Sequence, residues 1–429
     1  MLHSCTVFFG SVRLRLTEFR TFSSLRHRNF RYLCVSSLFY STAEWVQTVT
    51  MGWLMYELTG SRFAVGALWA VRALPSPIVS PIAGVLTDRM SRRKLLIGNQ
   101  IYVASIAVLL ALLVASDRAT ATHLYLFAAL NGAGTAFGTP LRQTLVANTV
   151  PPEDMQNAIG LNSTALTLMR IVGPAIGGVM IVLFGPGTNF LIQAGCYVGM
   201  GATVFLIRLE YRQGSKKAAS PLADMREGFA YITGRRRLMG LVIIAYVPAI
   251  FMMPFSAGLL PVFSKDILKQ DAGGLGMLLA MIGIGALIGT LAIATMKTKG
   301  ASDVAQVAAG ACGGLSLIVL SQMSVTGAAI PFCMGIGLGQ MIFINLNNTV
   351  VQTITPDALR GRVLSIYSLF IGIGPAGGFL SGLTAQALGV TSAMAIGGGV
   401  TIGLVLLIAL RFGLIGPQRR EGAPAKSLA

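Results

Sequence analysis

Charged residues are scarce in this sequence, and acidic residues are the scarcest of all. Charged side chains make up 11% of the 429 residues, with 15 acidic residues against 33 lysines and arginines. A soluble globular domain carries roughly a quarter charged residues. The composition therefore excludes an ordinary water-soluble protein. The 54% share of hydrophobic residues and the mean hydropathy of +0.72 instead indicate many segments exposed to lipid.

The sequence also lacks the patterns that metal, disulfide and nucleotide chemistry require. The three histidines are scattered along the chain, and the five cysteines form no CxxC or Cys/His spacing. No Walker A lysine follows a glycine-rich loop, and the run Gly335-Ile-Gly337-Leu-Gly339 lies inside an apolar stretch. We therefore predict no metal, no cofactor and no enzymatic activity. Energy for any transport has to come from an ion gradient or from the cargo itself.

What is abundant is apolar sequence, divided by polar breaks into twelve runs. Each run is close to the roughly 20 residues that cross a bilayer, and a backbone in lipid has to satisfy its own hydrogen bonds. The predicted fold is thus an all-α membrane protein with twelve transmembrane helices in two pseudo-symmetric six-helix bundles. The predicted spans are 31–56, 63–87, 94–116, 121–147, 157–184, 187–208, 238–264, 274–297, 302–324, 328–352, 360–385 and 391–412.

The basic residues are concentrated in alternate connections between these runs. One set of connections and the tails hold most of the arginines and lysines, whereas the other set holds only Arg62, Arg118, Lys265 and Lys269. By the positive-inside rule, twelve spans place both termini in the cytoplasm. The net charge of +18 then belongs to cytoplasmic loops and not to a nucleic-acid site. The predicted location is the inner (cytoplasmic) cell membrane, crossed many times.

A single long polar stretch divides the chain into two comparable parts. We predict a tail at 1–29, a six-helix bundle at 30–208, a cytoplasmic linker at 209–237, a second bundle at 238–412 and a tail at 413–429. The glycine-proline cluster at 173–178 is echoed at 374–378, and Pro-Glu-Asp at 152–154 is echoed by Pro-Asp at 356–357. These echoes indicate a duplicated unit, and duplicated halves place a binding site at their interface near the middle of the membrane.

The connection between the second and third runs carries a distinctive motif. It begins Gly84-Val-Leu-Thr-Asp88 and resembles the major facilitator superfamily loop motif Gly-x-x-x-Asp-Arg-x-Gly-Arg-Arg, with Ser91 in place of the second glycine. An ordinary basic loop would explain the arginines but not the acid at this spacing. The resemblance implies a cytoplasmic gate, with the carboxylate at the N-terminus of the eleventh span, where a helix dipole favours it. The implied gate residues are Gly84, Asp88, Arg89, Arg92 and Arg93.

Other phrases resemble the exporter branches of that superfamily. Gly-Pro-x-x-Gly-Gly in the fifth span, formed by Gly173, Pro174, Gly177 and Gly178, resembles the antiporter motif, although a generic helix-packing site would have the same composition. The phrases at 53–61, 139–143 and 152–163 resemble the transmembrane secretion effector branch, which includes enterobactin-type siderophore exporters and macrolide efflux proteins. One departure is that 131–135 lacks the arginine that many proton-coupled exporters carry in span four.

Charged side chains within spans are costly and are functional candidates for that reason. Glu44, Arg72 and Arg170 lie roughly 20 Å from the predicted cytoplasmic ends at 1.5 Å per residue, so Glu44 is placed to pair with either arginine. The pair is either purely structural or contains the proton-coupling residue, for which Glu44 is the candidate. Polar residues recur on the same helix faces and predict a wet central cavity. The cavity or substrate candidates are Ser41, Arg72, Asn131, Arg170, Asn345 and Asn348.

The leading hypothesis is a secondary-active exporter of small amphipathic molecules, siderophore- or drug-like, working by alternating access, with H⁺ as the candidate coupling ion. Two arginines against one glutamate favour an anionic or zwitterionic small-molecule substrate. The alternatives are uptake or facilitated transport of a metabolite or lysolipid and, more remotely, a non-transporting scaffold or sensor. The expected partners are the lipid bilayer, the cargo and H⁺, without nucleic acid, and the expected state is monomeric.

Overall fold

The computed structural model describes residues 23–147, 149–207, 221–295, 302–372 and 374–415, and all regular structure within these ranges is helical. The predicted all-α class is therefore confirmed. Nine of the described helices are long and apolar enough to cross a membrane. The three predicted ranges outside this set are 31–56, 121–147 and 360–385, whose described residues are also largely helical. The count of twelve spans stays a prediction.

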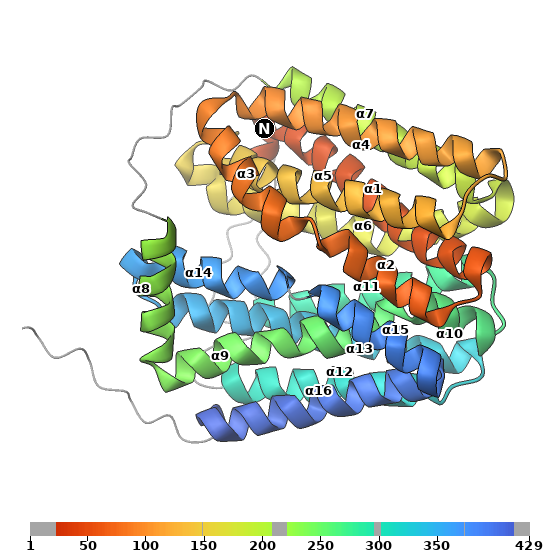
Figure 1. Ribbon diagram of the computed structural model, residues 1–429. Helices are drawn as coiled ribbons and strands as arrows, with labels where there is room; N and C mark the ends of the chain where they lie inside the picture. The colour runs from red at the N-terminus through yellow and green to blue at the C-terminus, as the bar shows by residue number, and fades with distance from the viewer. Residues whose placement is uncertain (1–22, 148, 208–220, 296–301, 373, 416–429) are drawn as a thin grey trace, which may run out of the picture.

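Seven α-helices make up the first part of the chain. They are α1 (Arg28–Thr59), α2 (Arg62–Ala73), α3 (Ser76–Arg89), α4 (Arg92–Ala115), α5 (Ala121–Ala147), α6 (Met155–Phe184) and α7 (Pro186–Leu206). Figure 1 shows them in red to yellow-green as one group. Within it α1 packs on α6 and α7, and α4 packs on α5 and α7. We call α1–α7 the first half.

The remaining helices form a second group, drawn in green to blue in Figure 1. They are α8 (Pro221–Thr233), α9 (Arg236–Val247), α10 (Leu260–Asp266), α11 (Ala272–Thr295), α12 (Ser302–Ser321), α13 (Thr326–Ile354), α14 (Asp357–Gly372), α15 (Gly374–Leu388) and α16 (Val390–Phe412). Helix α13 packs on α11 and α12, and α12 packs on α16. We call α9–α16 the second half. The domain limits assigned from sequence stay a prediction, because the linker and both tails lie largely outside the described residues.

Prolines explain where two of the helical runs change geometry. Pro75 has no N–H to bond the carbonyl of Val71, so α2 ends at Ala73 and α3 starts at Ser76. Between α9 and α10, Pro248 and Pro254 each begin a five-residue π-helical turn, Pro248–Met252 and Pro254–Gly258. The wider π turn is a common way for a helix to absorb such a disruption. Both changes occur within predicted spans.

The two halves meet through glycines. The main contacts between them join α6 to α11 and α2 to α15, with a shorter contact of α1 with α10. A β-carbon at Gly178 would lie 2.4 Å from the carbonyl oxygen of Ala272, and one at Gly66 would lie 2.4 Å from the Cα of Gly382. No side chain fits at either place. Small residues thus let the two backbones touch, as in other membrane helix pairs.

These contacts all lie toward one end of the molecule. Gly66, Gly178 and Ala272 are close to the connections at 60–61, 185 and 267–271, which belong to the predicted basic-poor set. Helix α8, which carries Arg226 and is followed by Arg235, lies at the opposite end and crosses the direction of the other helices (Figure 1). Within the described chain, the principal contacts between the halves are therefore concentrated toward the end remote from α8, and they extend to the middle of α6 at Arg170.

Candidate functional site

A carboxylate and a guanidinium form an ion pair inside the first half. Arg72 on α2 donates through Nη2 to Oε2 of Glu44 on α1, and the two side chains are 22% and 17% exposed. Arg72 lies in the last turn of α2, where the helix dipole favours a cation. Of the two partners predicted for Glu44, the structure selects Arg72. The other carboxylate oxygen, Oε1, is buried and accepts no hydrogen bond from the described protein.

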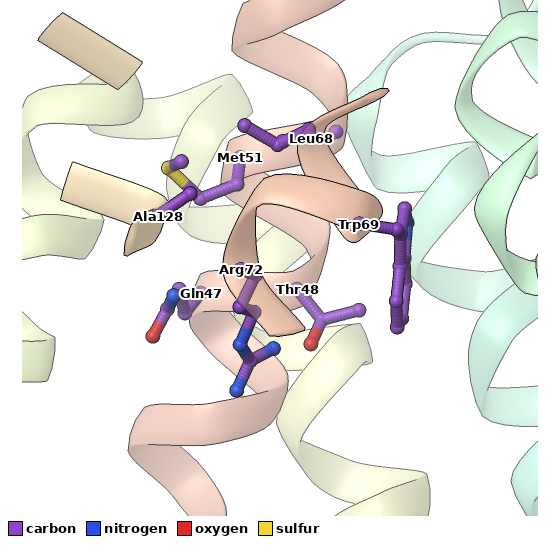
Figure 2. A pocket seen from close by; sticks show the side chains of 8 residues that line it. Gln47, Thr48, Met51, Leu68, Trp69, Arg72 and Ala128 are labelled. Atoms are coloured by element: carbon purple, nitrogen blue, oxygen red, sulfur yellow. The ribbon is translucent and has the colours of Figure 1, made fainter. Parts of the chain in front are cut away.

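The position of Arg72 depends on close packing behind it. A β-carbon at Gly132 of α5 would lie 1.8 Å from the carbonyl oxygen of Arg72, so only glycine allows α5 to approach this turn. A small cavity of about 20 Å³ adjoins the guanidinium and is lined by Gln47, Thr48, Met51, Gly52, Leu68, Trp69, Arg72 and Ala128. In the view of Figure 2, Gln47 lies to the left of Arg72, and Thr48 and Trp69 lie to its right. The cavity has room for one or two water molecules.

Arg170 on α6 reaches across to the second half. Its Nη2 donates to Oε1 of Gln340 on α13 at 3.1 Å, and its guanidinium carbon lies 5.4 Å from the ring centroid of Trp45. The backbone of Arg170 also faces α11, where a β-carbon at Gly283 would lie 2.8 Å from its carbonyl oxygen. Within the described part of the chain no carboxylate pairs with Arg170. This position thus holds an unneutralised cation between the halves.

The remaining cavity candidates differ in where they point. Ser41 is 4% exposed and donates to the carbonyl of Leu166 at 3.4 Å, so it joins α1 to α6. Asn131 is fully buried and donates to the hydroxyl of Tyr197 on α7 at 3.3 Å. Asn345 and Asn348 on α13 are half-buried, and Asn348 accepts from Gln352 at 2.9 Å. The structure therefore brings Glu44 and Arg72 together, and it directs Asn131 into the interior of the first half.

Sequence reasoning missed a row of polar residues on α7. Asn189, Gln193 and Tyr197 are almost fully buried and follow one another at intervals of four residues, which places them on one helix face. Gln193 donates to Oε1 of Gln47 on α1 and, at 3.3 Å, to the hydroxyl of Tyr197. Asn189 donates to Thr50 and to the carbonyl of Gly177, both at 2.8 Å. The spacing of four in an otherwise apolar run was the available signal.

The gate motif is described only in part. The side chains of Asp88 and Arg89 lie outside the described residues, so the predicted contact with the eleventh span stays a prediction. Gly84 is exposed, with open space where a β-carbon would point. Arg92 is half-buried. Arg93 donates to the backbone carbonyl of Phe205 and lies 4.8 Å from its ring centroid, so it caps the end of α7, and no described carboxylate pairs with it.

The glycines of the Gly-Pro-x-x-Gly-Gly motif pack α6 against two neighbours. A β-carbon at Gly173 would lie 2.6 Å from Cβ of Trp45, and one at Gly177 would lie 3.2 Å from Cα of Val46, both on α1. Gly178 faces α11, and the carbonyl of Pro174 lies 2.4 Å from a β-carbon built at Gly276. Close packing accounts for the motif, and two of its members form part of the contact between the halves.

A cluster of polar contacts closes the same end of the molecule. Asp266, at the end of α10, accepts from the hydroxyl of Tyr56 at 2.7 Å and from Nη2 of Arg62 at 3.2 Å. The ammonium of Lys265 lies 5.1 Å from the ring centroid of Trp53. These contacts join α10 of the second half to the first half. We call Tyr56, Arg62 and Asp266 the end clamp.

Asp266→Asn should weaken the end clamp. The Asp266 and Arg62 side chains are 25% and 36% exposed, so the pair is expected to contribute about 1 kcal/mol. Its loss should shift the equilibrium between the closed and open forms of this end about fivefold. The measurement is labelling of a Phe63→Cys thiol by a membrane-impermeant maleimide, in protein whose native cysteines are replaced by serine. Labelling should become about fivefold faster. Asp271→Asn is the control, because Asp271 caps Gly274 within α11 and asparagine caps equally well. Equal rates in both variants would contradict the clamp.

Comparison with known proteins agrees with this architecture. Solved structures that match include the nucleoside transporter NupG, with a TM-score of 0.71 at 14% identity over 90% of this chain and 99% of that one. A bacterial homolog of the human lysosomal transporter Spinster, in an inward-facing and unoccupied conformation, gives a TM-score of 0.68 at 16% identity over 90% and 95%. These likenesses show that the chain shares its fold with these two transporters.

The family model described as transmembrane secretion effector matches residues 19–426. The chain belongs to this family. Its relatives include the multidrug efflux pump Tap of Mycolicibacterium fortuitum, 26% identical over 80% of this chain and 86% of that protein. The staphyloferrin A transporter of Staphylococcus aureus is 24% identical over 88% and 94%. Macrolide efflux protein A of Streptococcus pyogenes is 23% identical over 82% and 88%. The resemblance predicted from sequence is thereby confirmed.

Proposed function

We propose that this protein is a secondary-active exporter that moves small amphipathic molecules out of the cell by alternating access, driven by protons. The observation that carries the proposal is that the two halves meet mainly at one end, while Glu44, Arg72 and Arg170 lie between that end and the other. A transporter of this fold binds cargo near the interface of its halves and rocks them about it. The multidrug and macrolide efflux proteins among its relatives support the export direction.

The state described here opens toward the cytoplasm under the predicted orientation. The basic connections face the cytoplasm by the positive-inside rule, and the glycine contacts and the end clamp lie at the opposite, extracytoplasmic end. An exporter collects cargo from the cytoplasm or inner leaflet in this state. The cycle then requires that the glycine contacts open and that the α8 end closes.

The chemistry near the interface favours anionic or zwitterionic cargo. Arg170 is half-buried and faces no described carboxylate, and it donates a hydrogen bond to the neutral amide of Gln340. A desolvated guanidinium binds a carboxylate more strongly than an amide, because its hydrogen bonds are then charge-assisted. Trp45 lies beside it at 5.4 Å and offers an aromatic face. A molecule that carries a carboxylate on an aromatic or apolar body fits both groups.

Arg170→Gln should discriminate between cargo charges. Loss of a hydrogen bond to a charged group costs about 1.5–3 kcal/mol, so efflux of the anionic dye fluorescein should fall about tenfold or more. Efflux of the cation ethidium should change little. Arg170→Lys keeps the charge and should retain most fluorescein efflux. Dye efflux from loaded cells is the measurement. Preferential wild-type export of ethidium, unaffected by Arg170→Gln, would contradict the assignment of anionic cargo.

Transport direction and coupling are tested together in membrane vesicles. Inverted and right-side-out vesicles containing the protein are energised with a pH gradient and offered a panel of siderophore-like, macrolide and dye compounds. An exporter accumulates cargo in inverted vesicles, and dissipation of the pH gradient stops accumulation. We refer to the compound accumulated most strongly as the reporter cargo. Accumulation confined to right-side-out vesicles would replace export by uptake, the alternative that the sequence leaves open.

A further inference from the structure

We propose that the coupling proton moves between Glu44 and the cytoplasmic side through a hydrated polar route inside the first half, away from the interface between the halves. The route runs from the cavity at Arg72, past Gln193 and Tyr197 of α7, to the cavity at Arg142. It rests on the proposed proton coupling at Glu44. The proton leaves the Glu44 carboxyl, passes along water molecules that the Tyr197 hydroxyl helps to hold in place, and is released to water at the cytoplasmic end, while Glu44 regains its charge opposite Arg72.

The first reason is that several buried side-chain oxygens of the first half accept no hydrogen bond from the described protein. Within the described first half, the buried side-chain atoms that have no partner are all carbonyl or carboxylate oxygens. Each unsatisfied polar group of this kind costs about 1–3 kcal/mol, and buried polar groups are normally satisfied. A set made only of acceptors calls for a donor, and water is the neutral donor that fits small spaces. These atoms are Glu44 Oε1, Gln100 Oε1, Asn131 Oδ1, Asn189 Oδ1 and Gln193 Oε1.

The second reason is that small cavities lie beside the row of polar residues on α7. The cavity at Gln47 and Arg72 measures about 20 Å³. A second, of about 10 Å³, is lined by Tyr40, Asn99, Gln100, Val103, Gly134, Thr135, Gly138, Arg142 and Tyr197. A third, of about 170 Å³, is lined by Leu33, Ser36, Ser37, Tyr40, Thr139, Arg142, Leu145, Asn162 and Leu166. The first two are of the order of one water molecule in size, and the last is near the α8 end of the bundle.

Hydrogen-bonded side chains connect the first cavity to the second. Gln47 lines the first cavity and accepts from Gln193, and Gln193 also donates to the hydroxyl of Tyr197, which lines the second. Asn131 donates to the same hydroxyl. Because the Tyr197 oxygen receives two N–H groups, its own hydrogen is available to donate onward. Both acceptor positions of this oxygen are filled by amide N–H groups, so the hydroxyl does not itself take up a proton. It donates its hydrogen to a water molecule of the chain and holds that water in place.

Tyr40 and Arg142 separate the second cavity from the third. Both residues line both cavities, and the guanidinium carbon of Arg142 lies 3.1 Å from the ring centroid of Tyr40. Arg142 also donates to Thr139 at 3.2 Å. A shift of the Arg142 side chain would join the second cavity to the third. The stacked pair is thus the point at which the route opens or closes.

The charges around the route favour water and protons over a metal cation. The charged or titratable groups that face Glu44 are Arg72 from α2, Tyr40 from α1, Tyr197 from α7 and, beyond Tyr40, Arg142 from α5. Two guanidinium groups repel a sodium ion, and the one carboxylate is already paired with Arg72. A neutral water chain incurs no such repulsion, and it can donate hydrogen bonds to the buried oxygens that have no other donor.

The test follows proton exchange at Glu44 itself and needs no cargo. Wild-type protein in liposomes of phosphatidylethanolamine and phosphatidylglycerol is subjected to a pH jump, and the carboxyl infrared band that disappears in Glu44→Gln is followed in time. Tyr197→Phe removes only the hydroxyl, and Gln193→Leu removes the amide that links the cavities. Each should slow protonation of Glu44 at least tenfold without moving its midpoint pH. Gln193→Glu offers an exchangeable group and should retain most of the wild-type rate.

Matched controls separate the route from general effects. Tyr125→Phe removes a hydroxyl from the same half, where it donates to the Ala64 carbonyl at 3.2 Å, and Gln306→Leu removes a buried amide from the second half. Both should leave the rate unchanged. If Glu44 titrates at an unchanged rate in Tyr197→Phe and Gln193→Leu, the route is wrong and proton coupling at Glu44 stands. If Glu44 shows no titratable band between pH 4 and pH 10, both proposals fail.

Discussion

Gly178→Leu should abolish export of the reporter cargo while the protein still folds. A β-carbon at this position already lies 2.4 Å from the Ala272 carbonyl oxygen and 3.0 Å from the Gly276 Cα, so a leucine forces α6 and α11 apart. Overpacking costs about 1–3 kcal/mol, which shifts a two-state equilibrium about 5- to 150-fold. The halves should therefore stay apart at the extracytoplasmic end. Vesicle transport and maleimide labelling at Phe63→Cys measure the two consequences.

The matched control lies on the same helix. Gly160 is exposed on α6, and nothing lies within 4 Å of a β-carbon built there. Gly160→Leu therefore adds the same side chain to the same helix without a clash. It should keep transport within about twofold of wild type, as surface substitutions usually do. Normal transport by Gly178→Leu, at normal expression, would show that the α6–α11 contact need not form as described.

Glu44→Gln should uncouple transport from the proton gradient. The amide cannot take up a proton, so proton-driven accumulation of the reporter cargo against its gradient should be lost. Downhill exchange of labelled for unlabelled cargo needs no net proton movement and should survive. The pH dependence of accumulation in inverted vesicles should become flat. Undiminished, still pH-dependent accumulation would remove Glu44 from the mechanism.

The purely structural alternative for Glu44 is tested by a second change. Glu44→Gln leaves Arg72 without its counter-charge, and breaking a buried pair destabilises a protein by about 3–5 kcal/mol, or less here because both groups are partly exposed. Glu44→Gln/Arg72→Gln removes both charges and should restore thermal stability. Coupled transport should stay lost in the double variant. Its recovery would mean that the pair only holds α1 to α2.

Much of the fold was accessible from sequence because the membrane imposes simple rules. Long apolar runs must be helices, and a charge inside one is rare enough to attract notice, which is how Glu44, Arg72 and Arg170 were found. The choice of partner for Glu44 was not accessible. It depends on the break after Ala73, which ends α2 near Glu44, and on the approach of α5 at Gly132. Neither feature changes the apolar pattern.

The helix faces were harder to predict than the helices. Asn131 was assigned to the central cavity because it lies on the same helix face as Thr135 and Arg142, yet its amide donates to Tyr197. The spacing along a helix shows which of its residues point the same way, but it does not show which neighbouring helix they contact. The amides of α7 escaped notice for a related reason. An uncharged Asn or Gln barely lowers the hydropathy of a span, so only its spacing reveals it.

The glycine contacts between the halves have a consequence for the energetics of the cycle. Where Gly66 meets Gly382 and Gly178 meets Gly276, the touching surfaces are mostly backbone. Separating them uncovers little side-chain surface and requires no interlocked side chains to find new rotamers. The two end states of such a joint can lie close in free energy. Binding of one small molecule or one proton, worth only a few kcal/mol, is then sufficient to reverse the balance.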